Sequence, residues 1–180
     1  MSLELVLEHL YLVVISCVAV IAVGIPLGIF TYYHARVGKI VLTIVDLIQT
    51  VPVLAVMGLL MTVFGANSVT VIIAMILYLL LPVVRNTNTG LNHVNPLMKV
   101  EFPLAFPFIL TGIRITVVNA VGVAVFGTFV GGGGLGSILY RGIRIQNLNL
   151  ILEGTLALIV ISMCFDYLLG FFEKKIRRFL

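Results

Sequence analysis

Long uncharged stretches, separated by short polar ones, dominate the 180-residue chain. An α-helix needs about 20 predominantly apolar residues to cross the roughly 30 Å hydrocarbon core of a bilayer. The uncharged stretch over 47–84 is too long for one helix, and the polar, glycine-containing segment 65–68 supplies a turn within it. The pattern therefore predicts an all-α integral membrane protein with a single transmembrane domain over residues 1–180. Its five transmembrane helices are expected at about 9–33, 40–64, 69–84, 104–130 and 150–172.

The composition supports lipid as the main surroundings of the chain. Apolar residues make up 61% of the sequence and charged residues only 10%, whereas a soluble domain is about 45–50% apolar and about 25% charged. So few charges cannot cover a water-exposed surface, which excludes a soluble enzyme. The basic residues separate apolar runs instead of forming one patch, so we expect a lipid bilayer and no nucleic acid as partner.

The positions of the basic residues predict the orientation in the membrane. Cytoplasmic loops of membrane proteins are enriched in Lys and Arg. In the five-helix arrangement, the far side holds Arg141 and Arg144. We therefore expect the N-terminus outside and the C-terminus in the cytoplasm. The eight basic residues on the expected cytoplasmic side are Arg36, Lys39, Arg85, Lys99, Lys174, Lys175, Arg177 and Arg178.

Three ionisable residues, Asp46, Arg114 and Asp166, lie inside the predicted spans, toward their cytoplasmic halves. A charge within lipid costs several kcal/mol, so such groups usually face a partner or water. We hypothesise that Arg114 neutralises one or both aspartates between helices. The alternative is that each side chain extends to the cytoplasmic interface.

Uncharged polar residues within the spans point to a second kind of site. Gln49 and Asn119 each carry an amide that needs a partner at membrane depth. They either join helices together or line a translocation pathway. Pro52, three residues after Gln49, removes a backbone donor and loosens its helix, which makes it a third pathway candidate.

No set of residues in the sequence has the spacing of a catalytic centre or a metal site. The segment Gly131–Gly136 matches G-x-G-x-x-G, but a dinucleotide site also needs a preceding strand within a βαβ unit, which the long apolar spans do not predict. No Lys-Ser/Thr pair follows, so it is not a phosphate-binding P-loop either. We expect no enzymatic activity and no cofactor in this chain.

Several short segments, in a fixed order, carry a family resemblance. They are Gln49-Thr50-Val51-Pro52, Leu81-Pro82-Val83-Val84-Arg85-Asn86-Thr87, Glu101-Phe102-Pro103-Leu104-Ala105 with Gly112-Ile113-Arg114, and Phe129-Val130-Gly131 running into Gly133-Gly134-Leu135-Gly136 and Arg141-Gly142. Together they resemble the permease subunits of ABC importers for glycine betaine, carnitine, choline and proline. The resemblance covers nearly the whole chain.

The resemblance implies the five-helix fold of type I importers, in the cytoplasmic membrane of a prokaryote. It also implies four partners: a second permease copy, either identical or a sister subunit, two cytoplasmic ABC ATPase subunits that bind ATP and Mg²⁺, and an external substrate-binding protein or domain. The solute would be a small osmoprotectant of the zwitterionic or quaternary ammonium type. Another amino-acid-like zwitterion, or an ion-coupled carrier or channel function, is the alternative.

The resemblance also places the ATPase-coupling loop at about 85–103. Permeases of this kind carry Glu-Ala-Ala, followed a few residues later by Gly, in this loop. Here Asn95-Pro96-Leu97 runs almost directly into Met98-Lys99-Val100-Glu101, so either the natural chain lacks that segment or the printed sequence omits it. A solvated loop is the alternative to an ATPase contact. The coupling candidates are Arg85, Asn86, Thr87, Asn92, His93, Lys99, Glu101 and Pro103.

The solute itself is the least constrained prediction. Quaternary ammonium groups are typically held among aromatic rings. This chain has no Trp, and its 11 Phe and 6 Tyr residues are spread along the spans. We therefore expect any aromatic cage to belong to the external receptor.

Overall fold

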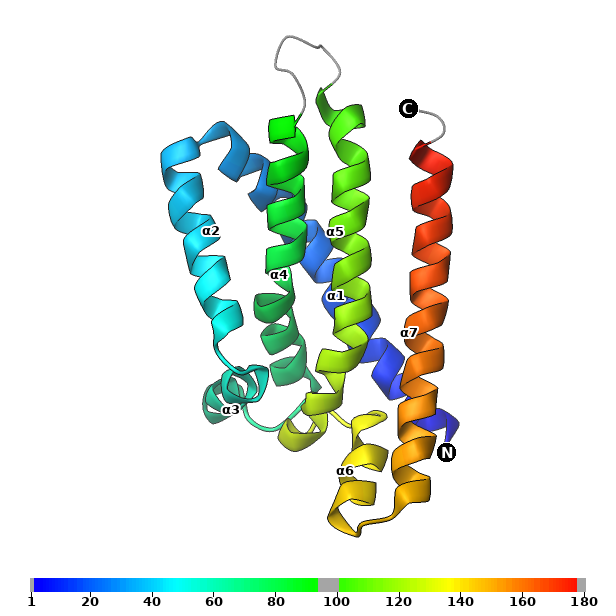
Figure 1. Ribbon diagram of the computed structural model, residues 1–180. Coiled ribbons are helices and arrows are strands. Elements are labelled where there is room, and N and C mark those ends of the chain that lie inside the picture. Colours follow the sequence, from blue (N-terminus) through cyan, green and yellow to red (C-terminus); the bar gives the residue numbers. More distant parts are fainter. Residues whose placement is uncertain (1, 94–100, 178–180) are drawn as a thin grey trace.

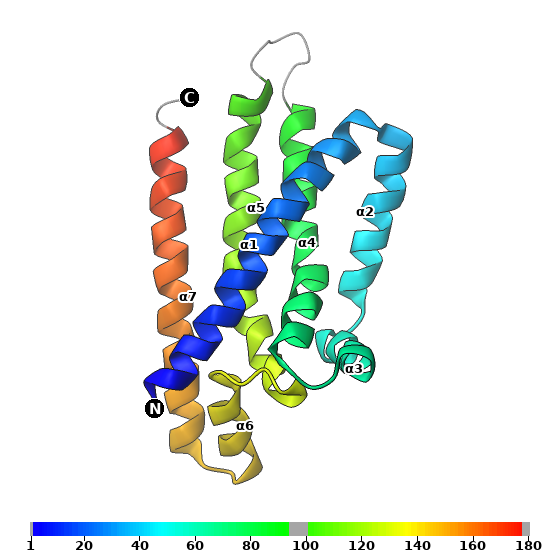
Figure 2. The same ribbon diagram turned by 180° about the vertical axis from the view of Figure 1, so that it is seen from behind.

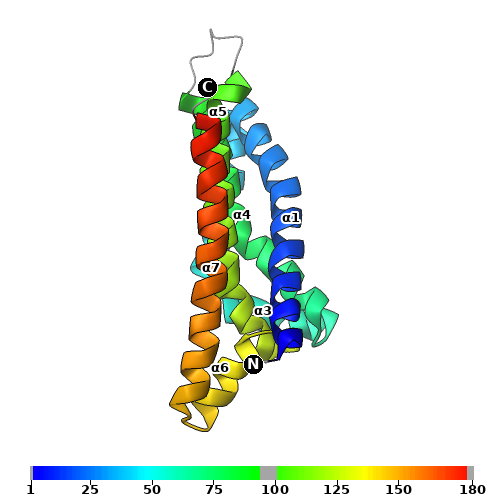
Figure 3. The same ribbon diagram turned by 90° about the vertical axis from the view of Figure 1, so that its right-hand side faces the viewer.

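The protein is helical throughout the described residues, 2–93 and 101–177, of the computed structural model. Most of the long helices run along one axis, and the two chain ends lie at opposite ends of the molecule (Figure 1). From behind, α1 crosses obliquely over α4 and α5 (Figure 2), and edge-on it lies to one side of them (Figure 3). The elements are α1 (Leu3–Tyr33), α2 (Ala35–Thr50), α3 (Val53–Phe64), α4 (Ser68–His93), α5 (Glu101–Ala124), the 3-10 helix η1 (Val125–Val130), α6 (Gly136–Arg144) and α7 (Leu148–Arg177).

The helix lengths fit a multi-pass membrane protein, and the expected all-α membrane fold is confirmed. Within the described residues, four segments are long and apolar enough to cross a membrane: α1, α4, Leu104–Val130 and Leu148–Lys175. The pair α2 and α3 passes the same test together, which gives up to five spans.

The span expected over 40–64 is divided between two helices, α2 and α3. The chain bends by 96° between α2 and α3. Pro52 cannot donate to the carbonyl of Ile48, and the residue before a proline avoids the helical region. Val51 is accordingly extended, with φ −77° and ψ 132°. The sequence therefore breaks this helix near the middle of its apolar run.

The third expected span, 69–84, lies within a longer helix, because α4 continues through Arg85 to His93. The polar residues that suggested a loop are compatible with this longer helix. The side chains of Asn86, Asn92 and His93 each bond the backbone carbonyl four residues earlier. The expected glycine-rich connection after η1 similarly contains a short helix, α6.

Close packing between α1 and α4 depends on two glycines one turn apart. A Cβ added at Gly24 would lie 2.9 Å from the Val83 side chain, and one added at Gly28 would lie 2.5 Å from Cβ of Thr87. Small residues at this spacing let helix backbones approach closely, which is a main source of helix association in membranes. Side chains from both helices, including Leu12, Val20 and Met75, form the centre of the core.

In contrast, α7 lies at the edge of the molecule (Figure 1). Only 6% of the residues in its most apolar stretch are buried within the chain, compared with 44% of the residues in the corresponding stretch of α4. Most of its apolar surface therefore faces lipid or another subunit, and specific contacts must hold it against α5.

Candidate functional site

The break between α2 and α3 places Gln49 beside α4. Its Nε2 donates to the backbone carbonyl of Tyr78 at 2.9 Å. This carbonyl needs a donor from outside the helix, because the residue four positions later is Pro82, which has no N–H. Gln49 thus satisfies a backbone group that the sequence of α4 leaves open.

A cavity of about 490 Å³ lies beside this break. It contains two of the pathway candidates, Gln49 and Asn119, from separate helices, whereas Pro52 forms the bend and is not among its walls. None of the lining residues is charged. The nine lining residues are Gln49, Val53, Tyr78, Leu79, Val118, Asn119, Gly122, Val123 and Phe126.

Asn119 is the exposed amide of this cavity. It lies close to the midpoint of the span Leu104–Val130. Within the described part of the chain, its side chain makes no hydrogen bond. An amide without a partner is costly in hydrocarbon. The arrangement therefore favours a wet cavity that can offer hydrogen bonds to a passing solute.

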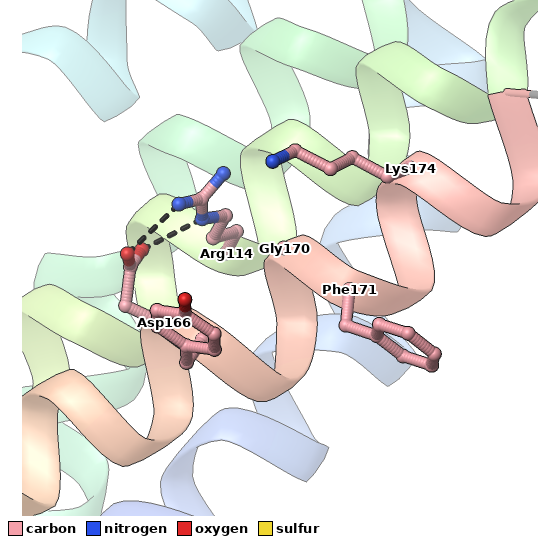
Figure 4. A pocket seen from close by; sticks show the side chains of 6 residues that line it. Arg114, Asp166, Gly170, Phe171 and Lys174 are labelled. Carbon is pink, nitrogen blue, oxygen red and sulfur yellow. Dashed lines mark hydrogen bonds and ion pairs between the residues drawn. The ribbon is translucent and has the colours of Figure 1, made fainter.

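A separate charged cluster joins α5 to α7 (Figure 4). Arg114 donates from Nε and Nη2 to the two oxygens of Asp166 at 2.6 and 2.8 Å. Its Nη1 lies 3.3 Å from Glu173, which also accepts from the Thr111 hydroxyl at 3.1 Å. Gly170 lies between the two acids on α7, and a Cβ there would be 3.2 Å from the guanidinium carbon. The glycine thus allows Arg114 to lie across the helix.

Of the two aspartates in the pairing hypothesis, Asp166 is the one that Arg114 contacts. Asp46 instead accepts from Nη2 of Arg85, with distances of 2.7 and 2.5 Å to its two oxygens. The side chains of Arg85 and Asp46 are 55% and 40% exposed. Arg85 reaches Asp46 because α4 continues beyond residue 84 and brings Arg85 alongside α2.

The structure divides the coupling candidates into three groups. Thr87 is buried against Gly28, so it is not available to a docking partner. Arg85, Asn86, Asn92 and His93 belong to the last turns of α4, and of these Asn92 and His93 are exposed at its end. Lys99 lies outside the described residues. Glu101 and Pro103 are in the first turn of α5, and their side chains lie outside the description as well.

Sequence reasoning missed a second set of contacts, at the opposite end of the bundle. Fully buried His9 donates its Nε2 hydrogen to the carbonyl of Val121 at 3.1 Å. Neighbouring Glu8 accepts from the backbone N–H of Gly134 at 2.9 Å. No local pattern could have paired residues 112 positions apart.

The described residues contain no group of three or more His, Cys, Asp or Glu side chains arranged to hold a metal ion. Gly131, Gly133 and Gly134 have positive φ values of 81°, 69° and 76°. These glycines shape the turn that passes Glu8 and His9, since such values are unfavourable for other residues. The glycine-rich segment thus has a structural role in packing against α1.

The bundle with its broken helix has the type I ABC importer permease fold. It matches a chain of the MetNI methionine ABC transporter, in an inward-facing conformation, with a TM-score of 0.84. The match covers 98% of this chain and 99% of that chain at 19% sequence identity, so it shows the fold alone.

The sequence places the chain within a particular family. The model of the binding-protein-dependent transport system inner membrane component family matches residues 21–97 and 90–178. The chain belongs to this family, and the resemblance drawn from its ordered segments is confirmed.

Three curated relatives illustrate the family. The carnitine transport permease protein OpuCD of Listeria monocytogenes is 37% identical over 171 residues, covering 86% of this chain and 77% of the relative. The glycine betaine/carnitine/choline transport system permease protein OpuCD of Bacillus subtilis is 35% identical, covering 94% and 81%. The osmoprotectant import permease protein OsmW of Salmonella typhimurium is 32% identical, covering 92% and 87%.

The comparison with the Listeria protein also indicates that this chain lacks some residues within the aligned region. The 171 aligned positions of the Listeria protein correspond to 86% of 180 residues, about 155, which leaves about 16 positions without a counterpart here. The family model matches in two pieces that meet at 90–97. This indicates that the unmatched positions lie near 90–97, where the resemblance had led us to expect a Glu-Ala-Ala segment.

Proposed function

We propose that this chain forms the membrane pathway of an ATP-driven importer for a small zwitterionic or quaternary ammonium solute, of the glycine betaine, choline, carnitine and proline type. The observation that carries the proposal is the unpartnered amide of Asn119 at mid-depth, in a cavity shared with Gln49. A protein built only to sit in lipid would have an apolar residue there. The relatives are named as transport permeases for such solutes, which supports a transport function for this chain.

The lining residues carry no charge, which suits both zwitterions and quaternary ammonium cations, because no fixed cation repels the ammonium group. A fixed charge would bind one end of a zwitterion strongly and slow its release. Conduction through a membrane site requires binding that is favourable enough to admit a solute and weak enough to let it leave. Amide groups meet both conditions, because they replace water around either end of the solute.

The proposed assembly contains a second permease copy, two cytoplasmic ABC ATPases with ATP and Mg²⁺, and an external substrate-binding protein or domain. The α1–α2 turn and the last turns of α4 and α7 lie at one end of the molecule (Figure 1), and basic residues are concentrated there. The positive-inside rule assigns that end to the cytoplasm. Asn92 and His93, exposed at the end of α4, are then placed to meet an ATPase.

Purification and transport measurements test this function together. The affinity-tagged chain, expressed with its native partners, should retain two ATPase copies for each pair of permease chains. Liposomes containing the assembly should accumulate radiolabelled glycine betaine, choline or carnitine only when ATP and the receptor are supplied. Uptake by this chain alone, without nucleotide, would instead indicate an ion-coupled carrier and contradict the proposal.

A further inference from the structure

The cavity beside the α2–α3 break brings together two aromatic side chains that are far apart in the sequence. Tyr78 comes from α4 and Phe126 from η1, and both line the cavity. Phe126 is 39% exposed, so part of its ring is accessible. Aromatic faces attract ammonium cations, and quaternary ammonium groups are commonly recognised in this way. The fold thus creates an aromatic wall that the distribution of Phe and Tyr along the chain does not reveal.

The same cavity offers hydrogen-bonding groups of a different kind. The Nε2 group of Gln49 is held by the Tyr78 carbonyl, which fixes the position of this amide. Asn119 has no hydrogen bond to another described residue, so both its donors and its acceptor are free for a ligand. An amide can donate to a carboxylate or exchange hydrogen bonds with a hydroxyl.

We propose that this cavity is a solute-recognition site within the permease itself. Phe126 and Tyr78 receive the methylated ammonium end of the solute, and Asn119, supported by Gln49, receives its carboxylate or hydroxyl end. The inference rests on the proposed function and deepens it, because selectivity then lies in this chain as well as in the external receptor.

The lack of a side chain at Gly122 increases the space that this site has for a solute. It lines the cavity, is exposed, and an added Cβ would meet no heavy atom within 4 Å. A larger side chain at residue 122 can therefore extend into the cavity without displacing the protein around it. Gly58 in α3 provides a matched control, since its Cβ would also meet nothing within 4 Å and it does not line the cavity.

The first experiment narrows the cavity in steps. Gly122→Ala and Gly122→Val are introduced into the complete importer in liposomes, and ATP-dependent uptake of glycine betaine and of the bulkier carnitine is measured. We expect Gly122→Val to lower the carnitine-to-betaine uptake ratio by about three- to tenfold, which corresponds to a modest loss of binding free energy. Gly58→Val should leave the ratio unchanged. An unchanged ratio in the folded Gly122 variants would overturn the proposal.

The second experiment uses the absence of tryptophan from this chain. Phe126→Trp places one Trp in each permease chain, and its emission is recorded in the permease–ATPase complex without external receptor, after subtraction of the signal from the complex with the unmodified chain. We expect choline to change the emission at concentrations about three- to tenfold lower than 3,3-dimethylbutan-1-ol, its uncharged isostere. Adding Asn119→Leu should weaken the choline response.

The outcomes separate the two proposals. If the unmodified importer moves none of these solutes with ATP, the proposed function fails. If it moves them, the recognition site fails and the proposed function stands in either of two cases: the uptake ratio is unchanged in the folded Gly122 variants, or the emission of the Phe126→Trp variant does not distinguish choline from its isostere.

Discussion

Two groups of polar side chains lie within the membrane-spanning helices, and they differ in whether they have partners within the chain. In the charged cluster between α5 and α7, Arg114 contacts both Asp166 and Glu173. In the cavity beside the α2–α3 break, the amide of Asn119 has no hydrogen bond within the described residues. The first group is closed by contacts within the chain, whereas the second remains open to a ligand.

We propose that this difference separates polar residues that hold the helices together from polar residues that meet a solute. Most of α7 lies outside the buried core, so paired charges have a clear structural role in attaching it to α5. No equivalent structural need explains Asn119, because α5 is already packed against α4 around Gly112. Unsatisfied hydrogen bonding at mid-depth is therefore the better indicator of function, and charge at membrane depth the better indicator of assembly.

Breaking the charged cluster should have the largest effect. Arg114→Leu removes the guanidinium that pairs with both Asp166 and Glu173, and the Glu173 side chain is only 12% exposed. We expect the loss of stability to exceed the about 1 kcal/mol of an exposed ion pair, because one of the two carboxylates is mostly buried. Thermal unfolding in detergent and the amount of protein in the membrane measure this loss.

Substitution of the two acidic residues of the cluster provides the control for this prediction. Asp166→Leu combined with Glu173→Gln in the Arg114→Leu chain removes the uncompensated charges and should recover part of the lost stability. A single Arg114→Leu variant as stable as the unmodified protein would show that the cluster does not hold α7.

Removing the free amide of Asn119 should lower transport without lowering stability, the reverse of the effect expected for Arg114→Leu. Asn119→Leu removes the free amide and should leave the unfolding temperature unchanged or higher, while ATP-dependent uptake falls about tenfold, equivalent to about 1.4 kcal/mol. Thr62→Val is the matched control, because the exposed Thr62 hydroxyl bonds only to its own helix. Normal uptake by the Asn119 variant would refute the assignment of this residue to the pathway.

Gln49→Leu should have an intermediate effect, because Gln49 belongs partly to each group. The substitution leaves the Tyr78 carbonyl without its side-chain donor, and Pro82 offers no replacement. We expect a loss of about 1 kcal/mol of stability, together with reduced uptake. Thr50→Val, which removes a hydroxyl bonded within α2, should change neither measurement. Equal behaviour of the two variants would remove Gln49 from the site.

The smallest effect is expected from Asp46→Asn. This change breaks an ion pair in which both side chains are at least 40% exposed. Exposed pairs contribute about 0–1 kcal/mol, so unfolding should shift by no more than this amount, even though Asp46 and Arg114 look equivalent in the sequence. A loss as large as that of Arg114→Leu would show that exposure in the isolated chain misjudges the surroundings of Asp46.

The sequence contained enough information for the fold class, because uncharged runs of membrane length are a direct consequence of hydrocarbon thickness. It also indicated Gln49 and Asn119, since amides at membrane depth need partners. The bend at Pro52 was signalled, but its angle depends on how α3 packs against α4 and η1. The partner of Asp46 could not be predicted, because it depends on the continuation of α4 to Arg85, and polar residues had favoured a loop there.

Longer-range contacts were beyond sequence reasoning for a different reason. His9 and Val121, like Tyr78 and Phe126, meet only once the helices have packed. Their positions follow from the docking of whole helices, which in a membrane is decided by small differences in van der Waals packing. A run of apolar residues contains little information about which of its faces will meet which neighbour.

The 96° bend after α2 has a consequence for the depth of α3 in the bilayer. Because α2 runs along the long axis of the molecule, α3 lies across it (Figure 1). Its 12 residues therefore share nearly one level, whereas 12 residues of α4 descend through about 18 Å at 1.5 Å per residue. Spin labels scanned through 53–64 should report almost the same distance from the bilayer centre, with only the helical rotation modulating the signal. We therefore expect α3 to lie parallel to the membrane plane, beside the cavity.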